Sequence, residues 1–216
     1  MNTVELIGWY GGDKAIARAA WTSTQIDVEA KTEEQIRDLI VNKLWNNPTG
    51  KPHKTPFERG LVEFNITVEQ ASHIHLLKHR LANINGESAR YMELKEDKLY
   101  LPEDWLEYGE IGKYWYDQLK ATSEFANEQY HKALKHLQEV GMSRKRAKES
   151  SRFFKTMNSQ ITLSVMMNMS CFANFVNLRG ADDAQLEIRE ITEQLVNIVK
   201  QIEGNPFKYT LEAFKL

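Results

Sequence analysis

Residues 61–68 carry the pattern that most constrains the fold of this chain. Apolar side chains occupy every second position, and polar side chains occupy the positions between them. The apolar set is Val62, Phe64, Ile66 and Val68. This two-residue period predicts a β-strand with one buried and one exposed face. A second strand is predicted over Thr3–Tyr10, where Gly11 and Gly12 close it.

Most of the remaining chain has helical spacing. Asp13 is placed to cap a short helix through Trp21, and Thr32–Gln35 forms a capping-box pattern ahead of another helix. Further helices are predicted over about Glu69–Leu81, Glu107–Val140, Ser143–Phe154 and Gln160–Leu178, and Asp182 or Asp183 caps a last one. The predicted fold class is therefore α+β, a small sheet with many helices around it.

Composition limits the function classes that need to be considered. A chain of 216 residues predicts one domain over residues 1–216. A formal net charge of -2 argues against binding nucleic acid by bulk electrostatics. No apolar run approaches the roughly 20 residues of a membrane helix, and no signal peptide is expected. The single cysteine suits a reducing compartment. We therefore expect a cytoplasmic protein without nucleic-acid or membrane partners.

Arginines near short polar motifs are the first candidates for chemistry. They are Arg80, Arg90, Arg152 and Arg179. The planar guanidinium fork suits phosphate and carbonyl–imide edges. Together with Ser88 these residues describe an anion site for a nucleotide phosphate. The alternative is that each arginine pairs with a local glutamate such as Glu87 or Glu187.

The residues around the histidines and the single cysteine argue against a metal site and against a nucleophilic thiol. His75 and His79 lie four residues apart on the predicted helix, but Leu76 follows where the zinc motif H-E-x-x-H has its glutamate. No metal is expected. Cys171 lies in an apolar segment without a basic neighbour, so a buried, inert thiol is favoured over a nucleophile.

Three short blocks, in order along the chain, resemble a known family. They are His53–Glu58, then Lys78-His79-Arg80 with Ser88-Ala89-Arg90-Tyr91, then Asn177-Leu178-Arg179 with Ala184–Arg189. These blocks are similar to the signature blocks of the flavin-dependent thymidylate synthases. The resemblance implies that family's fold, with a small, mostly antiparallel sheet.

The resemblance also implies an activity and its ligands. The expected reaction is FAD-dependent methylation of dUMP to dTMP, with methylenetetrahydrofolate as one-carbon donor and NADPH as reductant. The implied small-molecule substrates are dUMP and the folate. The implied assembly is a homotetramer with active sites shared between subunits.

Site residues follow from the same resemblance, position by position. Arg179 and Ser88 are the implied catalytic residues, with Arg179 facing the uracil ring. The implied cofactor-binding residues are His53, Thr55, Lys78, His79, Arg80, Gly86, Asn168, Met169, Ser170 and Asn174. The implied substrate-binding residues are His75, Leu76, Lys78, Glu87, Ser88, Ala89, Arg90, Arg152 and Arg179.

Two alternatives remain open from the sequence. The nucleotide-binding arginine matches Arg152 when counted back from Asn168, whereas counting forward from Gly141 gives Lys148. The activity could also be that of a related pyrimidine-nucleotide C5 methylase or hydroxymethylase with an altered base. A further alternative is an inactive nucleotide-binding relative.

Overall fold

The computed structural model describes residues 1–24, 27–88 and 90–216. Contacts within the chain divide it into two compact units. Unit 1 contains Met1–Asn2, Thr67–Leu76 and Asn85–Leu163, and unit 2 contains Thr3–Ile66, Leu77–Ile84 and Ser164–Leu216. The single domain over residues 1–216 stays a prediction.

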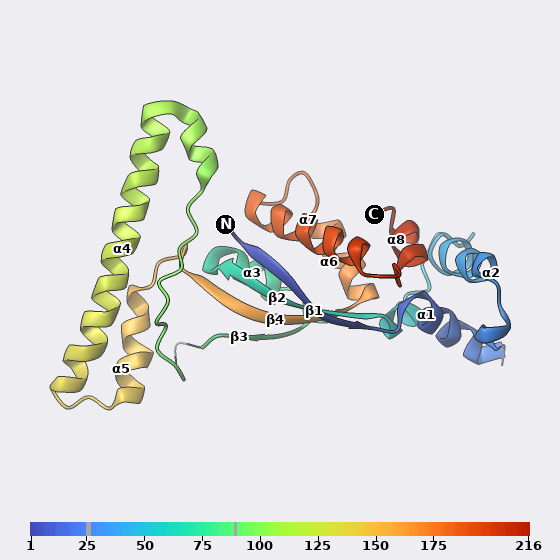
Figure 1. Cartoon of the computed structure of the whole chain (residues 1–216), viewed down its shortest axis with the longest axis horizontal. Helices are drawn as coiled ribbons and strands as arrows, with labels where there is room; N and C mark the ends of the chain where they lie inside the picture. The colour runs from blue at the N-terminus through green and yellow to red at the C-terminus, as the bar shows by residue number, and fades with distance from the viewer. Residues whose placement is uncertain (25–26, 89) are drawn as a thin grey trace. The chain divides into compact units, whose positions relative to one another are not determined.

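The strands form one small sheet (Figure 1). They are β1 (Thr3–Tyr10), β2 (Leu61–Glu69), β3 (Asn83–Gly86) and β4 (Gln160–Asn168), in the order β1-β2-β4-β3. The sheet is antiparallel, which confirms the predicted α+β class. The helices are α1 (Gly12–Trp21), α2 (Glu33–Arg37), α3 (Gln70–Leu77), α4 (Gly109–Glu139), α5 (Arg144–Ser151), α6 (Met169–Arg179), α7 (Leu186–Gln201) and α8 (Lys208–Phe214).

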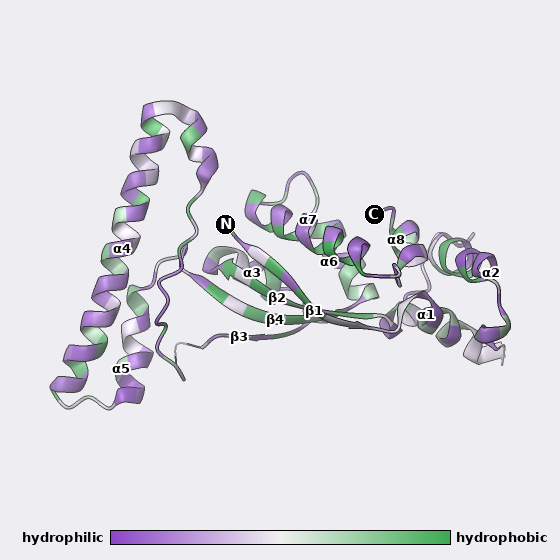
Figure 2. Cartoon of the chain, viewed as in Figure 1, coloured by the Kyte–Doolittle hydropathy of each residue, from purple (hydrophilic) through white to green (hydrophobic). Residues whose placement is uncertain are grey.

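Side-chain burial alternates along the two long strands β2 and β4, so each has one buried face. The four apolar residues of the 61–68 pattern are fully buried in β2, as predicted. Strand β4 has the same alternation, with Ile161, Leu163, Val165 and Met167 buried. Figure 2 shows hydrophobic residues along both strands and mostly polar residues along α4.

The helix predicted over Gln160–Leu178 was wrong for its first half. Residues 160–168 form β4, because their two-residue apolar period matches the pairing with β2. The change to helix occurs at Asn168, whose side chain accepts a hydrogen bond from the Cys171 backbone N–H at 2.8 Å. Helix α6 then ends at Arg179, with Gly180 as its C-cap.

The helix predicted over Glu69–Leu81 was also wrong in length. Helix α3 ends at Leu77, so Lys78, His79 and Arg80 lie after the helix and not on its last turn. Leu76 is buried, whereas Leu77 is 53% exposed. The chain then enters β3, a strand that the sequence pattern did not predict. At Gly86 an added Cβ would lie 2.5 Å from the Leu163 side chain, so glycine permits this close strand approach.

Unit 1 contains α4 and α5, which pack against each other (Figure 1). The side chain of Lys155 is 4% exposed and ion-pairs with Asp97 at 2.8 Å. Its ammonium also donates to Asn127 Oδ1 at 2.8 Å and lies 4.5 Å from the Tyr130 ring centroid. A buried charge requires such partners, so this network fixes the segment after α5.

Unit 2 contains a buried carboxylate with a different role from the one predicted. Asp13 does not cap its own helix, whose N-cap is Gly11. Its carboxylate instead accepts from the backbone N–H groups of Tyr209 and Thr210 at 2.7 and 3.0 Å, and from the Thr210 hydroxyl at 2.6 Å. Asp13 therefore caps α8, far along the chain.

Burial raises the pKa of Asp13 from 3.8 to about 6, although the hydrogen bonds from Thr210 and Tyr209 oppose this rise. The carboxylate is therefore ionised at pH 8.

At α7, Gln185 is the N-cap, so the predicted cap by Asp182 or Asp183 was wrong.

We expect Asp13→Ala to lower the free energy of unfolding by about 2–3 kcal/mol at pH 8, because buried donors of α8 lose their acceptor. Urea unfolding measures this loss. Asp27→Ala is the matched control, since Asp27 is exposed and accepts one backbone N–H, that of Glu29. Its expected cost is about 0.5–1 kcal/mol. Equal losses for the two variants would contradict the capping role of Asp13.

Candidate functional site

One polar contact of unit 2 joins two residues from separate motifs. Arg179 Nε donates a hydrogen bond to His79 Nε2 at 3.1 Å. His79 is 7% exposed, and its ring lies 4.7 Å from the Phe175 ring, measured between centroids. The residue thus has a fixed ring plane and one defined partner.

Burial and this contact both act on the protonation state of His79. Burial lowers the pKa of His79 below its ordinary value of 6.5, and the adjacent Arg179 guanidinium lowers it further. The imidazole is therefore neutral at pH 7. Because Nε2 accepts the hydrogen bond, the ring proton resides on Nδ1.

The pair lies in the wall of a small cavity of about 180 Å³, which Lys78, Arg80 and Asn174 also line. Within the described residues, Lys78, Arg80 and Arg179 have no carboxylate within ion-pair distance. Three uncompensated cations around one cavity form a site suited to anionic or carbonyl-bearing ligands.

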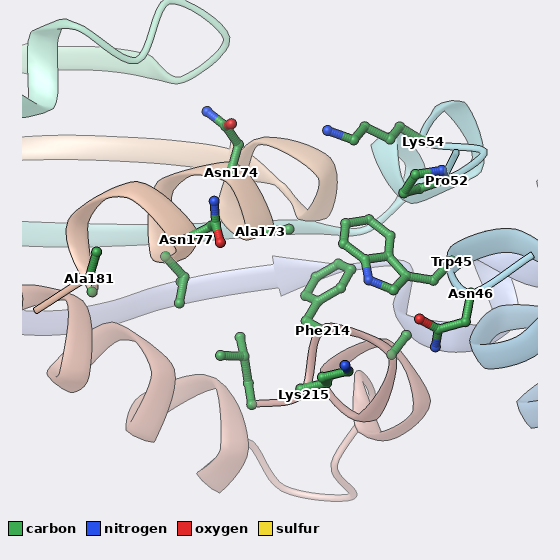
Figure 3. Close-up of a pocket in the computed structure, with 14 residues that line it drawn as sticks. Trp45, Asn46, Pro52, Lys54, Ala173, Asn174, Asn177, Ala181, Phe214 and Lys215 are labelled. Carbon is green, nitrogen blue, oxygen red and sulfur yellow. The ribbon is translucent and has the colours of Figure 1, made fainter. Parts of the chain in front are cut away.

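A larger cavity of about 750 Å³ is lined by other residues of the same unit. Figure 3 shows Trp45 and Phe214 side by side in its wall, with ring centroids 4.5 Å apart. Asn174 and Asn177 face it from α6, and Lys54 faces it from the segment before the Thr55–Arg59 turn. Asn174 lines both cavities.

The other cofactor residues implied by the resemblance occupy varied positions in unit 2. His53 and Thr55 are exposed and flank Lys54 in the chain. Asn168 caps α6, so its side-chain oxygen already has a partner. Met169 and Ser170 are buried in the first turn of α6.

Unit 1 has its own polar cavity, of about 390 Å³. Ser88, Glu87 and Arg152 line it together, although Arg152 follows Ser88 by more than sixty residues. His73 and Lys155 are also in its wall. The Glu87 carboxylate accepts from the Thr162 N–H at 2.9 Å, which leaves Arg152 without an ion-pair partner among the described residues. The unit thus holds a cationic wall beside a serine hydroxyl.

Two remaining basic residues of unit 1 have local partners. Arg90 ion-pairs with Glu149 at 3.1 Å, which is the glutamate-pairing alternative, though with a different glutamate. Lys148 Nζ donates to the Tyr91 carbonyl at 2.5 Å and is not part of the cavity wall. Of the two alternatives for the nucleotide-binding residue, Arg152 is the one in the wall. Ala89 lies outside the described residues.

Helix α3 holds the other implied substrate residues. Leu76 is fully buried, and His75 has a buried Nδ1 without a hydrogen-bond partner in the described structure. Because α3 ends at Leu77, His79 is not one helical turn from His75, and the premise of a paired metal site was wrong. No group of three or more potential ligands for a metal ion occurs within residues 1–24, 27–88 and 90–216. Cys171 is a free, buried thiol whose pKa is raised by burial, as expected of an inert cysteine.

Some lining residues were not predicted. Trp45 and Phe214 line the larger cavity but were not predicted, because aromatic residues at helical spacing usually indicate the hydrophobic core and not a binding site. Helix α8, which carries Phe214, was not predicted at all. Asn177 was named in the sequence only as part of the Asn177-Leu178-Arg179 block and not as a residue of a binding site. No helix among the described residues is long and apolar enough to cross a membrane.

Known proteins resemble this chain over nearly its full length. The family model described as thymidylate synthase complementing protein matches residues 5–203. A flavin-dependent thymidylate synthase of Thermosipho africanus is 29% identical, over 98% of this chain and 90% of the relative. The enzyme of the same name from Clostridium tetani is 28% identical, over 82% of this chain and 75% of the relative.

A solved structure agrees in fold. The crystal structure of a UMP/dUMP methylase from Streptomyces cacaoi, bound with 5-Br dUMP, superposes with a TM-score of 0.82. It is 24% identical, and the match covers 100% of this chain and 95% of that chain. The chain belongs to the thymidylate synthase complementing protein family and is an enzyme of the methyltransferase class.

The His79–Arg179 contact can be tested by titration. Nuclear magnetic resonance of the imidazole should give His79 a pKa below 6.5. Arg179→Met should raise that pKa, but not fully to 6.5, because burial is the larger cause. His73 is the control, since burial alone lowers its pKa and the variant should leave it unchanged. A His79 pKa that does not respond to Arg179→Met would show that the two side chains are not in contact.

Proposed function

We propose that this chain catalyses the FAD-dependent reductive methylation of dUMP to dTMP, with methylenetetrahydrofolate as one-carbon donor and NADPH as reductant. The observation that carries the proposal is Arg179, a half-buried arginine held by a neutral histidine and not by a carboxylate. A carboxylate partner would neutralise the guanidinium, whereas His79 orients it and leaves its charge available. Family membership supports the same reaction.

The charge of Arg179 has a defined chemical use in this reaction. C5 of the uracil ring must become nucleophilic toward a one-carbon electrophile, so negative charge develops on the ring. A fixed cation beside the ring stabilises that charge without reorganisation at the moment of reaction. We assign this role to Arg179 and assign its orientation to His79.

The phosphate of dUMP needs a different cation. Arg152 and Ser88 share the unit 1 cavity and offer a guanidinium fork and a hydroxyl donor, which fit a phosphate. Lys155 lies in the same wall, but Asp97 and Asn127 already occupy its ammonium. We therefore propose Arg152, not Lys148, as the phosphate-binding residue.

The residues of unit 2 fit a flavin dinucleotide. Lys78 and Arg80 are exposed cations without ion-pair partners in the described structure, which suits a diphosphate. Asn174 presents an amide to both cavities. When bound, the flavin would supply the hydride that completes the methyl group. His53 and Thr55 would add polar contacts at the same end of unit 2.

Tritium release from C5-labelled dUMP tests the reaction most directly. The proposal expects release with dUMP, methylenetetrahydrofolate and FAD present, and little release with dCMP in place of dUMP. Release with dCMP but not with dUMP would indicate that the substrate carries a base other than uracil. A yellow protein whose flavin bleaches on addition of NADPH would exclude an inactive nucleotide-binding protein.

Arg179→Ala should separate the two halves of the reaction. We expect methyl transfer to fall by roughly two to three orders of magnitude, the typical loss when a charge-stabilising group is removed. Oxidation of NADPH by the flavin should remain mostly intact, because no charge develops on the uracil ring in that step. Arg179→Lys is the matched control and should retain part of the activity. More than about a tenth of wild-type methyl transfer in the alanine variant would contradict the electrostatic role.

We also propose a cytoplasmic homotetramer whose active sites are shared between subunits. Support comes from the chain itself, since Ser88 and Arg179 belong to different compact units and line different cavities. Closed symmetric assemblies often combine residues from neighbouring copies in one site.

Subunit mixing tests the shared site. Ser88→Ala and Arg179→Ala should each be inactive alone, and mixed tetramers should regain activity because some sites draw both residues from intact copies. Native mass spectrometry confirms the exchange of subunits. Mixed tetramers that form but stay inactive would contradict shared sites between these two residues.

A further inference from the structure

His73 is a titratable residue in the wall of the unit 1 cavity, and the proposed reaction gives it no role. It lies on α3 and is half-buried. Its ring has no hydrogen-bond or ion-pair partner among the described residues. Burial alone lowers the pKa of His73 below its ordinary value of 6.5, so the imidazole is neutral at pH 7.

Backbone hydrogen bonds bring His73 to the same cavity as the proposed phosphate-binding residues. The first two residues of α3 donate from their N–H groups to the carbonyls of Ser159 and Met157, both at 3.2 Å. These carbonyls belong to the segment that follows Arg152. The residue before Ser88 donates its N–H to a carbonyl of β4 at 3.0 Å. The positions of all three wall residues are thus set by the backbone of unit 1.

The charges around this cavity balance without His73. Among the described wall residues, Arg152 and Lys155 are cations and Glu87 is an anion. The ammonium of Lys155 is already paired with Asp97 at 2.8 Å. A nucleotide phosphate carries close to two negative charges at pH 7, because its second pKa is about 6. Arg152 alone therefore leaves part of that charge without compensation.

Two other titratable groups lie close to His73 in the chain but are not in the cavity wall. The Glu69 carboxylate is 3% exposed and accepts hydrogen bonds from the Asn2 amide and the Ser72 N–H. His75 lies on the same helix as His73. Within the described wall, His73 is therefore the group that can gain a positive charge near neutral pH.

We propose that His73 is a further phosphate-binding residue of this chain, and that it takes up a proton from solvent when the nucleotide binds. This inference rests on the proposed function, which assigns the phosphate to Arg152 and Ser88. A phosphate dianion beside the imidazole favours its charged form, and the imidazolium in return donates a charge-assisted hydrogen bond. The gain in affinity is complete below the pKa of free His73 and is lost as the pH rises through its higher pKa in the complex.

The test is a titration of FAD-loaded protein with dUMP, followed by calorimetry. His73→Gln keeps a polar side chain with an N–H donor but cannot become cationic. At pH 6.5 we expect this variant to raise the dissociation constant about tenfold, the effect of losing one charge-assisted contact to a ligand. At pH 8.5 the two proteins should bind dUMP with more similar affinity, because less of the imidazole in the complex is then charged.

Proton uptake gives a second readout, which a structural role would not change. Titrations at pH 6.5 in two buffers with different ionisation enthalpies count the protons bound with each nucleotide. Wild-type protein should take up roughly half to one proton more than His73→Gln. Titration of the phosphate itself is common to both proteins and cancels in this difference.

A control and a measurement without any variant complete the test. His136→Gln removes an exposed imidazole of the same unit that is not in the cavity wall, and it should bind dUMP as the wild type does. In the wild-type protein, nuclear magnetic resonance should show the pKa of His73 rising on saturation with dUMP, and this result does not depend on the stability of a variant.

The outcomes separate this inference from the proposed function. If wild-type protein methylates dUMP but His73→Gln shows equal affinity and equal proton uptake, the role of His73 is overturned and the proposed function stands. A loss of affinity that is the same at pH 6.5 and pH 8.5, without a difference in proton uptake, shows a structural role only and also overturns the inference. If wild-type protein does not bind dUMP, the proposed function itself fails, and this inference fails with it.

Discussion

The alternating burial of β2 and β4 is the constraint on which the rest of this structure depends. One face of each strand is buried, so a shift of one residue in either strand would expose its whole apolar set. The end of each strand leads directly into a helix that carries site residues. Strand β4 passes into α6 at Asn168, and β2 passes into α3 at Glu69, whose buried carboxylate accepts from the Ser72 N–H at 3.0 Å. Strand register therefore fixes where each of these helices begins.

Much of the fold could be predicted where a pattern is local. The 61–68 strand, the Thr32–Gln35 capping box and the long helix near Gly109–Glu139 depend on neighbours in the chain. What could not be predicted depends on distant partners. Residues 160–168 form a strand because they pair with β2. Asp13 accepts hydrogen bonds from backbone N–H groups of α8, which lie nearly two hundred residues away in the chain. The contact between Arg179 and His79 was not predicted, because no local pattern links residues a hundred positions apart.

The polar groups of this chain divide into two kinds. Lys155 is buried and fully paired, and Lys155 and His131 hold the pKa of Asp97 below its usual value, although burial, the largest single influence, acts to raise it. Such groups fix the structure. Arg179, Arg152 and Lys78 have no carboxylate partner in the described residues, and their charge is therefore available to a ligand. In this chain, a charged side chain without an ion-pair partner in the described residues indicates the functional site better than residue type alone does.

Central to this account is the claim that Arg179 stabilises negative charge on a pyrimidine ring. The ionisation of 5-fluoro-dUMP at N3, followed by fluorine nuclear magnetic resonance as the pH is changed, reports that stabilisation in the bound state. The account predicts a lower N3 pKa for the bound nucleotide than for the free one, and a return toward the free value with Arg179→Gln. A bound N3 pKa equal to that of the free nucleotide, at saturating protein, would contradict it.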